Sequence, residues 1–219
     1  MKLYSYFRSS AAFRVRIALN LKQLNCEIIP VHLVKNGGEQ HAPAFQVLSP
    51  RGEVPCLVDG DVVLSQSMAI LDYLESKFPS PKLTGATYQE RARVIELSEM
   101  INSGIHPVQN LKVLQKLEKD FFSKDEQKES WARHWIEDGF TAFEKRLEQS
   151  SGKFCVGDSI SWADIYLVPQ VFNAKRYKVN MEKFPKIADI DSRCMQMAEF
   201  IKADPMHQVD TPSELKSKP

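Results

Sequence analysis

The first 22 residues constrain the fold more than any other part of this chain. Residues 2–7 (KLYSYF) are typical of a short strand, and residues 13–22 predict a helix with its apolar side chains on one stripe. Ser9 and Ser10 therefore stand where a strand gives way to a helix N-terminus. Unpaired backbone N–H groups and the positive end of the helix dipole stabilise anions at such a position.

A thiol held at a helix N-terminus ionises more readily, as helix-terminal cysteines do. Here the two residues after the serines are alanines, so a thiol at this place must arrive on a small molecule. The four cysteines are scattered, with no C-x-x-C pair and no spacing typical of metal ligands. We therefore expect reduced thiols, no metal and a cytoplasmic location.

Composition excludes several classes of function. The net charge of +1 provides no overall attraction to nucleic acid or to an anionic membrane surface. No apolar run approaches the ~18 residues of a membrane span, and the chain begins with a strand pattern instead of a signal peptide. The histidines are dispersed, and no P-loop, G-x-G-x-x-G or H-E-x-x-H motif occurs, so nucleotide and metal chemistry lack support.

Strand and helix patterns alternate up to about residue 78. After the first helix we expect a strand at 27–33, a hairpin at 54–58 and 62–64, and a helix at 66–78. This order predicts a mixed sheet with helices packed against it, an α+β domain of residues 1–80. The proline-rich stretch that follows predicts a linker at 81–86.

The remainder, residues 87–219, predicts an all-α domain. Four amphipathic patterns indicate helices at 88–117, 124–149, 162–175 and 187–202. Pro107 should bend the first of them, because proline removes one backbone hydrogen bond. Ser161 and Asp164 resemble a capping box that opens the third helix. We expect the polar tail from Asp204 onward to lie extended on the surface.

Two further places in the first domain suit an extended peptide. Val54-Pro55 precedes a strand, where proline marks either a turn or an open edge, and at an edge the backbone of Val54 can pair with a ligand. Gln66-Ser67 opens a helix and offers an amide, a hydroxyl and free N–H groups to a carboxylate. The alternatives are a turn proline without a ligand and an ordinary helix N-cap.

A thiol site, a backbone clamp and a carboxylate site together match a γ-glutamyl-cysteinyl-glycine peptide. With these features the chain resembles the glutathione transferases, most closely their zeta class, whose signature corresponds to residues 9–18 (SSAAFRVRIA). The resemblance covers nearly the whole chain. Other matching stretches are QNL (109–111), VGD (156–158), AD (163–164), LVPQV (167–171), NAKRYKV (173–179) and DTPSEL (210–215).

The resemblance implies a thioredoxin-like first domain, glutathione as cofactor and a homodimer. It implies that the Ser9 hydroxyl hydrogen-bonds the glutathione sulfur and that Ala11 stands where better-known members carry cysteine, which excludes a covalent or redox role there. The implied pocket residues around Ser9 are Ser10, Ala11, Ala12, Phe13 and Arg14, and those that hold the peptide are Gln40, Val54, Pro55, Gln66 and Ser67. His106, Asn110, Leu111 and Lys112 are expected to line the rest of the cleft.

The zeta class also implies a reaction, the cis–trans isomerisation of maleylacetoacetate by reversible addition of the glutathione thiolate. Such a dicarboxylate-like substrate requires cations, and Arg14 and Arg176 are the candidates, because arginine suits bidentate carboxylate binding. Arg8 or Arg16 can serve as well as Arg14.

Other activities remain open. A maleylpyruvate isomerase would use the same chemistry on a shorter diacid, and glutathione conjugation or dehalogenation would need the same thiolate with a different pocket. From another class, the same fold also serves as a non-catalytic interaction module. The joint presence of Ser9, Val54-Pro55 and Gln66-Ser67 favours an enzyme.

Overall fold

The last part of the chain packs with its beginning. The computed structural model describes residues 1–216, which form two compact units: Met1–Pro81 together with the segment from Met195 onward, and Lys82–Cys194. The predicted boundaries of 1–80, 81–86 and 87–219 remain a proposal about domains. In space, however, the segment after Cys194 belongs to the first unit.

The first unit contains a four-stranded mixed sheet in the order β2-β1-β3-β4. Its strands are β1 (Lys2–Ser5), β2 (Glu27–Pro30), β3 (Cys56–Asp59) and β4 (Val62–Ser65). β1 runs parallel to β2 and antiparallel to β3, with Leu3 opposite both Ile28 and Leu57. The predicted mixed sheet and hairpin are confirmed, although each strand is short.

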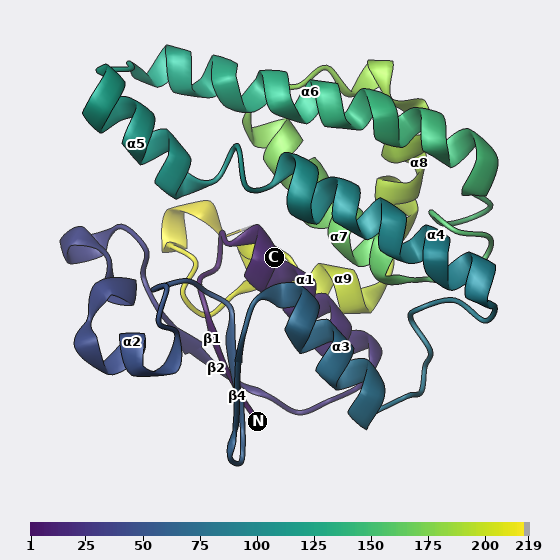
Figure 1. Cartoon of the computed structure of the whole chain (residues 1–219), viewed down its shortest axis with the longest axis horizontal. Coiled ribbons are helices and arrows are strands. Elements are labelled where there is room, and N and C mark those ends of the chain that lie inside the picture. The colour runs from purple at the N-terminus through teal and green to yellow at the C-terminus, as the bar shows by residue number, and fades with distance from the viewer. Residues whose placement is uncertain (217–219) are drawn as a thin grey trace. The chain divides into compact units, whose positions relative to one another are not determined.

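Helices α1 (Ser10–Leu21), α3 (Ser67–Lys77) and α9 (Ala198–Ala203) belong to this unit, and α1 packs against both of the others (Figure 1). The helix α1 begins at Ser10, three residues earlier than its apolar pattern indicates, because Ser9 caps it. Between β2 and β3 lie two single 3₁₀ turns, at 35–37 and Glu39–His41, and the short helix α2 (Pro43–Leu48).

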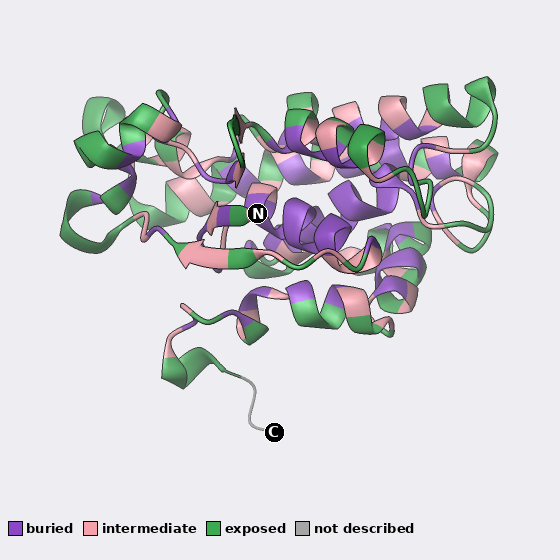
Figure 2. Ribbon diagram, turned by 90° about the horizontal axis from the view of Figure 1, so that it is seen from below, coloured by how far each residue is buried: buried purple, intermediate pink, exposed green. Residues whose placement is uncertain are grey.

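The second unit consists of helices around a central helix, α7 (Trp162–Arg176), most of which is buried (Figure 2). The other helices are α4 (Tyr88–Glu99), α5 (Leu111–Phe121), α6 (Asp125–Ser150) and α8 (Pro185–Cys194). Helices α4 and α8 pack against α7, whereas α5 packs against α6. The predicted capping box is confirmed: the Asp164 carboxylate accepts from the backbone N–H of Ser161 at 2.8 Å and from its hydroxyl at 2.9 Å. The two-part fold expected of a glutathione transferase is thus present.

The prediction of one bent helix at 88–117 is wrong. The helix α4 ends at Glu99, a π-helical turn covers Met100–Ile105, and α5 begins only at Leu111. Pro107 lies in the non-helical turn between them, so it separates two helices instead of bending one. The turn is held by the indole N–H of Trp131, which donates to the carbonyl of Val108 at 2.8 Å.

The predictions for the C-terminal part also need correction. The expected helix at 187–202 is two helices, α8 and α9, separated by residues 195–197. The chain after Asp204 is not an extended surface tail, since it forms a 3₁₀ turn at Pro205–His207 and buries Pro205, Gln208 and Thr211. The reason is tertiary: α9 packs against α1, and Asp210 accepts from the backbone N–H of Phe7, contacts that helical periodicity cannot reveal.

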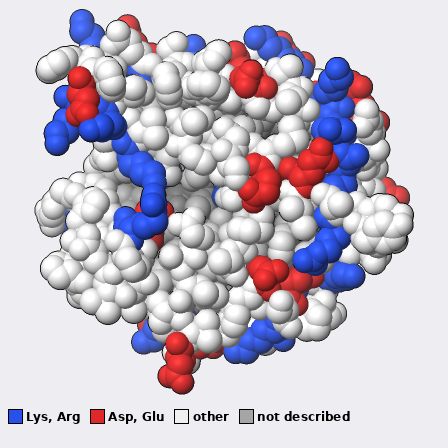
Figure 3. Space-filling view, viewed as in Figure 1, with Lys and Arg blue, Asp and Glu red and all other residues white. Residues whose placement is uncertain are grey.

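Charge on the molecular surface is mixed in sign. On the face shown in Figure 3, basic and acidic side chains are interspersed, in keeping with the net charge of +1. Within residues 1–216 no helix has the length and apolar character needed to cross a membrane. All four cysteines are free thiols, and three of them are buried.

Candidate active site

Ser9 occupies the N-cap of α1, where the sequence places it. Its backbone is extended (φ −71°, ψ 116°), and its Oγ accepts from the N–H of Ala12 at 3.2 Å. The N–H of Ser9 donates to the carbonyl of Tyr6 at 2.9 Å, which closes the turn between β1 and α1. A partly exposed hydroxyl therefore stands at the positive end of a 12-residue helix, the environment that favours an anion.

The residues that follow Ser9 differ in exposure. Ser10, Ala12 and Phe13 are buried, whereas Ala11 is half-buried beside Ser9. Arg14, predicted to contact a substrate carboxylate, is only 1% exposed, and its Nη1 donates to Ser67 Oγ at 3.2 Å. The arginine thus joins the second turn of α1 to the first residue of α3. Its predicted contact with substrate stays a prediction.

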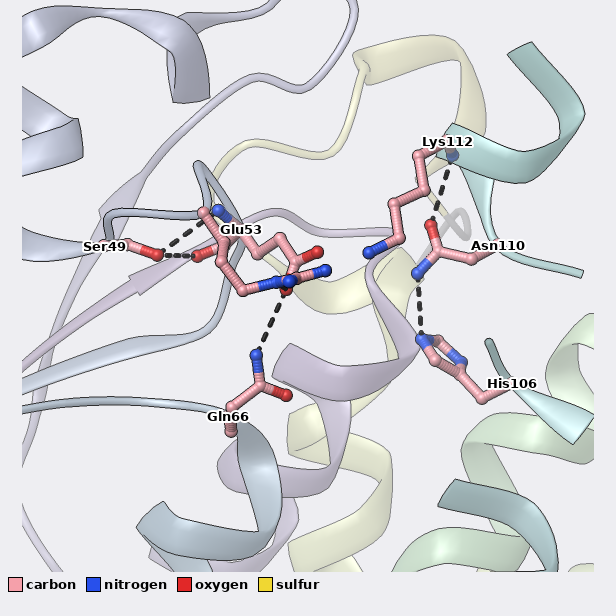
Figure 4. A network of polar contacts seen from close by, with 7 residues as sticks. Ser49, Glu53, Gln66, His106, Asn110 and Lys112 are labelled. Atoms are coloured by element: carbon pink, nitrogen blue, oxygen red, sulfur yellow. Dashed lines mark hydrogen bonds and ion pairs between the residues drawn. The ribbon is translucent and has the colours of Figure 1, made fainter. Parts of the chain in front are cut away.

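Gln66 and Ser67 lie at the N-terminus of α3. Gln66 is the N-cap residue and has a positive φ of 75°, a conformation that non-glycine residues adopt mainly where function or packing requires it. Its exposed side chain donates from Nε2 to Glu53 Oε2 at 3.1 Å (Figure 4). Ser67 is buried at the first helical position. The combination places an amide, a hydroxyl and a carboxylate around one helix N-terminus.

Val54 is joined to Pro55 by a cis peptide bond and lies immediately before β3. β3 is an inner strand, paired on both sides, so the open-edge explanation for this proline is wrong. The ladder begins only at Cys56, and the backbone N–H and C=O of Val54 make no hydrogen bond within residues 1–216. The free donor and acceptor therefore come from the turn before the strand, and they can still pair with an extended peptide.

Gln40 lies in the 3₁₀ turn before α2 and is 7% exposed. Its Nε2 donates to the carbonyl of Leu33 at 3.2 Å, while its Oε1 has no hydrogen-bond partner among the described residues. Gly52 makes this arrangement possible, because a Cβ there would lie 2.8 Å from the carbonyl oxygen of Gln40. A buried, unsatisfied acceptor is costly unless a ligand or water reaches it.

The predicted residues of the second unit gather at the start of α5. Asn110 is the N-cap residue of α5, and its Oδ1 accepts from the N–H of Lys112 at 3.4 Å (Figure 4). Its Nδ2 lies 3.5 Å from His106 Nε2. Leu111 is half-buried, and Lys112 is exposed. Arg176 lies elsewhere, at the C-terminus of α7, with its guanidinium 5.0 Å from the centre of the Tyr177 ring.

The first unit alone offers what a thiol-bearing peptide requires. A hydroxyl at a helix N-terminus suits a thiolate, an unpaired backbone N–H and C=O suit a peptide bond, and a second helix N-terminus suits a carboxylate. Among residues 1–216 no group of three His, Cys, Asp or Glu side chains could hold a metal ion. The hydroxyl, the backbone donor and acceptor, and the two helix N-termini fit glutathione.

Comparison with known proteins agrees with this chemistry. Models of the N-terminal and C-terminal domains of glutathione S-transferase match residues 3–82 and 112–202. Maleylacetoacetate isomerase of Rattus norvegicus is 45% identical over 215 residues, which cover 98% of this chain and 97% of that protein. The holo structure of a maleyl pyruvate isomerase, described as a bacterial glutathione S-transferase of the zeta class, is 39% identical, with a TM-score of 0.94 over 97% of this chain and 100% of that one.

The chain belongs to the zeta class of glutathione S-transferases. A third relative carries the cofactor: maleylacetoacetate isomerase of Methylobacterium extorquens, solved with bound malonate and glutathione, is 33% identical. Its TM-score is 0.93 over 97% of this chain and 100% of that one.

Sequence reasoning missed two acidic residues that this zeta-class enzyme places beside the predicted ones. Glu53 binds the side chain of Gln66, and Asp210 accepts from the backbone N–H of Phe7, just before Ser9. Glu53 stands directly before Val54-Pro55, and this position in the sequence could have marked it as a residue of the site. Asp210 opens the DTPSEL stretch, whose match to the zeta class is visible in the sequence, but its contact with Phe7 is not.

Proposed function

We propose that this chain is a glutathione-dependent cis–trans isomerase that converts maleylacetoacetate to fumarylacetoacetate. The observation that carries the proposal is Ser9 at the N-cap of α1, in a unit that also offers a free peptide backbone at Val54. The 45% identity to the rat isomerase over 98% of the chain supports the choice of reaction.

Glutathione, when bound, supplies a thiolate that adds reversibly to the cis double bond and thereby permits rotation about it. The role of Ser9 is to donate a hydrogen bond from its hydroxyl to the sulfur. A free thiol has a pKa near 8.5, and lowering it to about 6.5 requires about 2.7 kcal/mol. A helix N-terminus contributes ~0.3–1 kcal/mol, up to ~2 when partly buried, and a hydrogen bond to a charged group ~1.5–3. Together these are sufficient without a basic side chain.

The remaining predicted residues hold the peptide. The N–H and C=O of Val54 would pair with the peptide backbone, and Gln66, Ser67 and the α3 N-terminus would bind a carboxylate. Gln40 Oε1 is an acceptor for an N–H of the ligand. Ser10, Ala11, Ala12 and Phe13 would shape the thiol pocket around Ser9, and Pro55 fixes the turn beside Val54.

In the second unit, Arg176 would bind the dicarboxylate-like substrate, and the other predicted residues would line the rest of the cleft: His106, Asn110, Leu111 and Lys112. The cations Arg176 and Lys112 are both exposed, so each is accessible to a substrate carboxylate. We further propose a cytoplasmic homodimer that acts in the catabolism of tyrosine and phenylalanine.

Maleylpyruvate isomerisation is the second candidate. The likeness to the maleyl pyruvate isomerase structure, with a TM-score of 0.94, favours it specifically. The two substrates require the same thiolate and differ in the length of the diacid, so the cations of the second unit would decide between them.

The test is isomerisation of maleylacetone, a stand-in for maleylacetoacetate, with and without glutathione. Strictly glutathione-dependent turnover that falls at least ~100-fold in Ser9→Ala would support the proposal. Glutathione binding without this turnover would favour maleylpyruvate or halogenated acids as substrates. No binding of glutathione would make a non-catalytic module the better explanation.

A further inference from the structure

The C-terminal segment contacts the turn that carries Ser9. We define the clasp as residues 204–211, which follow α9. Its carboxylate Asp210 accepts a hydrogen bond from the backbone N–H of Phe7 through Oδ2 at 2.8 Å. Phe7 is buried and lies two residues before Ser9, in the turn between β1 and α1. The clasp therefore reaches the chain just ahead of the predicted thiol site.

Arg16 bonds to the same turn through the turn's carbonyl groups. This residue of α1 is 3% exposed, and its guanidinium donates to the carbonyl of Phe7 at 3.0 Å and to that of Tyr6 at 3.4 Å. It also donates to Ser5 Oγ at 3.0 Å and, through Nε, to the carbonyl of Ala203 at 2.9 Å. One buried side chain thus joins the β1–α1 turn to the end of α9.

These contacts converge on Ser9. The carbonyl of Tyr6 that Arg16 approaches also accepts the N–H of Ser9 at 2.9 Å. The peptide groups of Phe7 are held at both ends, at the N–H by Asp210 and at the carbonyl by Arg16. Since Ser9 is the N-cap residue, the path of residues 6–9 sets where its hydroxyl lies relative to the helix N-terminus.

The clasp has its own internal bonds, so Asp210 is held in place. The side-chain amide of Gln208 donates to the carbonyls of Lys202 at 3.0 Å and Asp204 at 2.8 Å. The hydroxyl of Thr211 donates to the carbonyl of Pro205. Gln208 and Thr211 are both buried. These bonds satisfy the buried polar groups and fix the path of the chain that leads to Asp210.

Charge balance also links the two residues. Burial lowers the pKa of the Arg16 guanidinium to about 9, and the carboxylates of Asp210 and Asp204 oppose this effect. No carboxylate among the described residues lies within 4.0 Å of Arg16, so its positive charge is balanced at longer range by the clasp. Removal of Asp210 therefore affects both the N–H of Phe7 and the cation that holds its carbonyl.

We propose that Asp210 and Arg16 are positioning residues for Ser9, which hold the Tyr6–Ser9 turn so that the Ser9 hydroxyl meets the sulfur of bound glutathione. This inference rests on the proposed function for the identity of the ligand. It assigns to the C-terminal clasp a part in thiol activation, through the backbone and without contact with the substrate.

The test compares Asp210→Ala with Asn20→Ala as a matched control. Asn20 also joins α1 to the C-terminal segment, donating from Nδ2 to the carbonyl of Glu199 at 2.8 Å, but it does not touch the turn. The pKa of glutathione bound to each variant is read from the ultraviolet absorbance of its thiolate, together with kcat, the KM for glutathione and the melting temperature. We expect Asp210→Ala to raise the bound thiol pKa and to lower kcat about 10-fold, with a smaller change in KM.

Equal thiol pKa and kcat in Asp210→Ala and Asn20→Ala would overturn the inference, because loss of stability alone would then explain both. Asp210→Asn keeps an oxygen acceptor for the Phe7 N–H, so it should fold and lose only about 2- to 3-fold in kcat. If Asp210→Ala does not fold, Asp210→Asn is compared with Asn20→Ala instead. Equal thiol pKa and kcat in these two variants would then overturn the inference.

The measured pKa of bound glutathione also distinguishes a failure of this inference from a failure of the proposed function. A wild type that ionises bound glutathione but does not isomerise maleylacetone would contradict the proposed reaction, and the thiol pKa of the variants would still decide on the clasp. A wild type that binds glutathione without lowering its thiol pKa would overturn the positioning role itself.

Discussion

Arg14 Nη1 donates to Ser67 Oγ across 3.2 Å, and both side chains are almost fully buried. The bond connects the second turn of α1 to the first residue of α3, the two helices whose N-termini carry the predicted thiol and carboxylate sites. A hydroxyl that accepts from arginine still has its own proton to donate to a carboxylate. Arg14 is thereby suited to orient Ser67.

From this bond we expect Arg14→Met to raise the KM for glutathione about 10-fold, because Ser67 loses the group that orients it. Ser67→Ala should have a similar effect. If the two residues act through their shared bond, the double variant will be little worse than either single variant. Fully additive losses in kcat/KM would show that the two act independently.

The contact between Gln66 and Glu53 gives a second prediction. Glu53→Gln removes the charge that accepts the Gln66 amide, so we expect glutathione to bind about 3- to 10-fold more weakly in a calorimetric titration. Arg51→Ala is the matched control, since Arg51 also contacts Glu53, at 3.3 Å, but its side chain is 68% exposed. Equal affinities in both variants would contradict a role for Glu53 in the site.

Asp164 is expected to dominate the stability of the second unit. Its buried carboxylate accepts from Ser161 through both the backbone and the hydroxyl, and from the N–H of Cys155 at 2.8 Å. Asp164→Ala leaves these donors without a partner, so the free energy of unfolding should fall by about 2–4 kcal/mol in urea titrations. Asp158→Ala, an exposed site in the same region, should cost much less.

The capping box of α4 predicts a dependence on pH. Backbone N–H groups of Thr87 and Ala86 bond to the Glu90 carboxylate and lower its pKa below the ordinary value of 4.5. A carboxylate with a lower pKa in the folded state stabilises the protein above its unfolded pKa, and this contribution is lost as the pH falls through the folded pKa.

The melting temperature of the wild type should therefore exceed that of Glu90→Gln at pH 7, and the difference should shrink as the pH falls below about 4.5. A difference that stays constant down to pH 3 would mean that the carboxylate charge contributes nothing to the cap.

Elements governed by local signals could be predicted from the sequence. Ser9, Gln66 and the Ser161–Asp164 box are recognisable because caps depend on residues within a few positions of each other. The break between α4 and α5 was not predictable in the same way. An amphipathic pattern continues through residues 100–111, while the backbone widens to a π-helical turn and then leaves the helix at Pro107.

Contacts between residues that are distant in sequence account for most of the features that the sequence did not predict. The bond from Phe7 to Asp210 spans 203 positions, and no periodicity signals it. The polar composition of the tail favours a solvated chain, yet Gln208 and Thr211 are buried because their polar groups bond to backbone carbonyls. Glu53 was missed because its partner Gln66 lies 13 positions away in the sequence. The β3–β4 hairpin between the two residues brings them together.

The discontinuous first unit has a consequence for synthesis on the ribosome. Arg16 needs the carbonyl of Ala203, and Phe7 needs Asp210, so the N-terminal half of the chain emerges long before its own final contacts exist. A nascent chain that has been synthesised only as far as the second unit carries Ser9 on a turn that still lacks its contacts with Ala203 and Asp210. The β1–α1 turn can therefore reach its final set of contacts only after residues 203–210 have been synthesised.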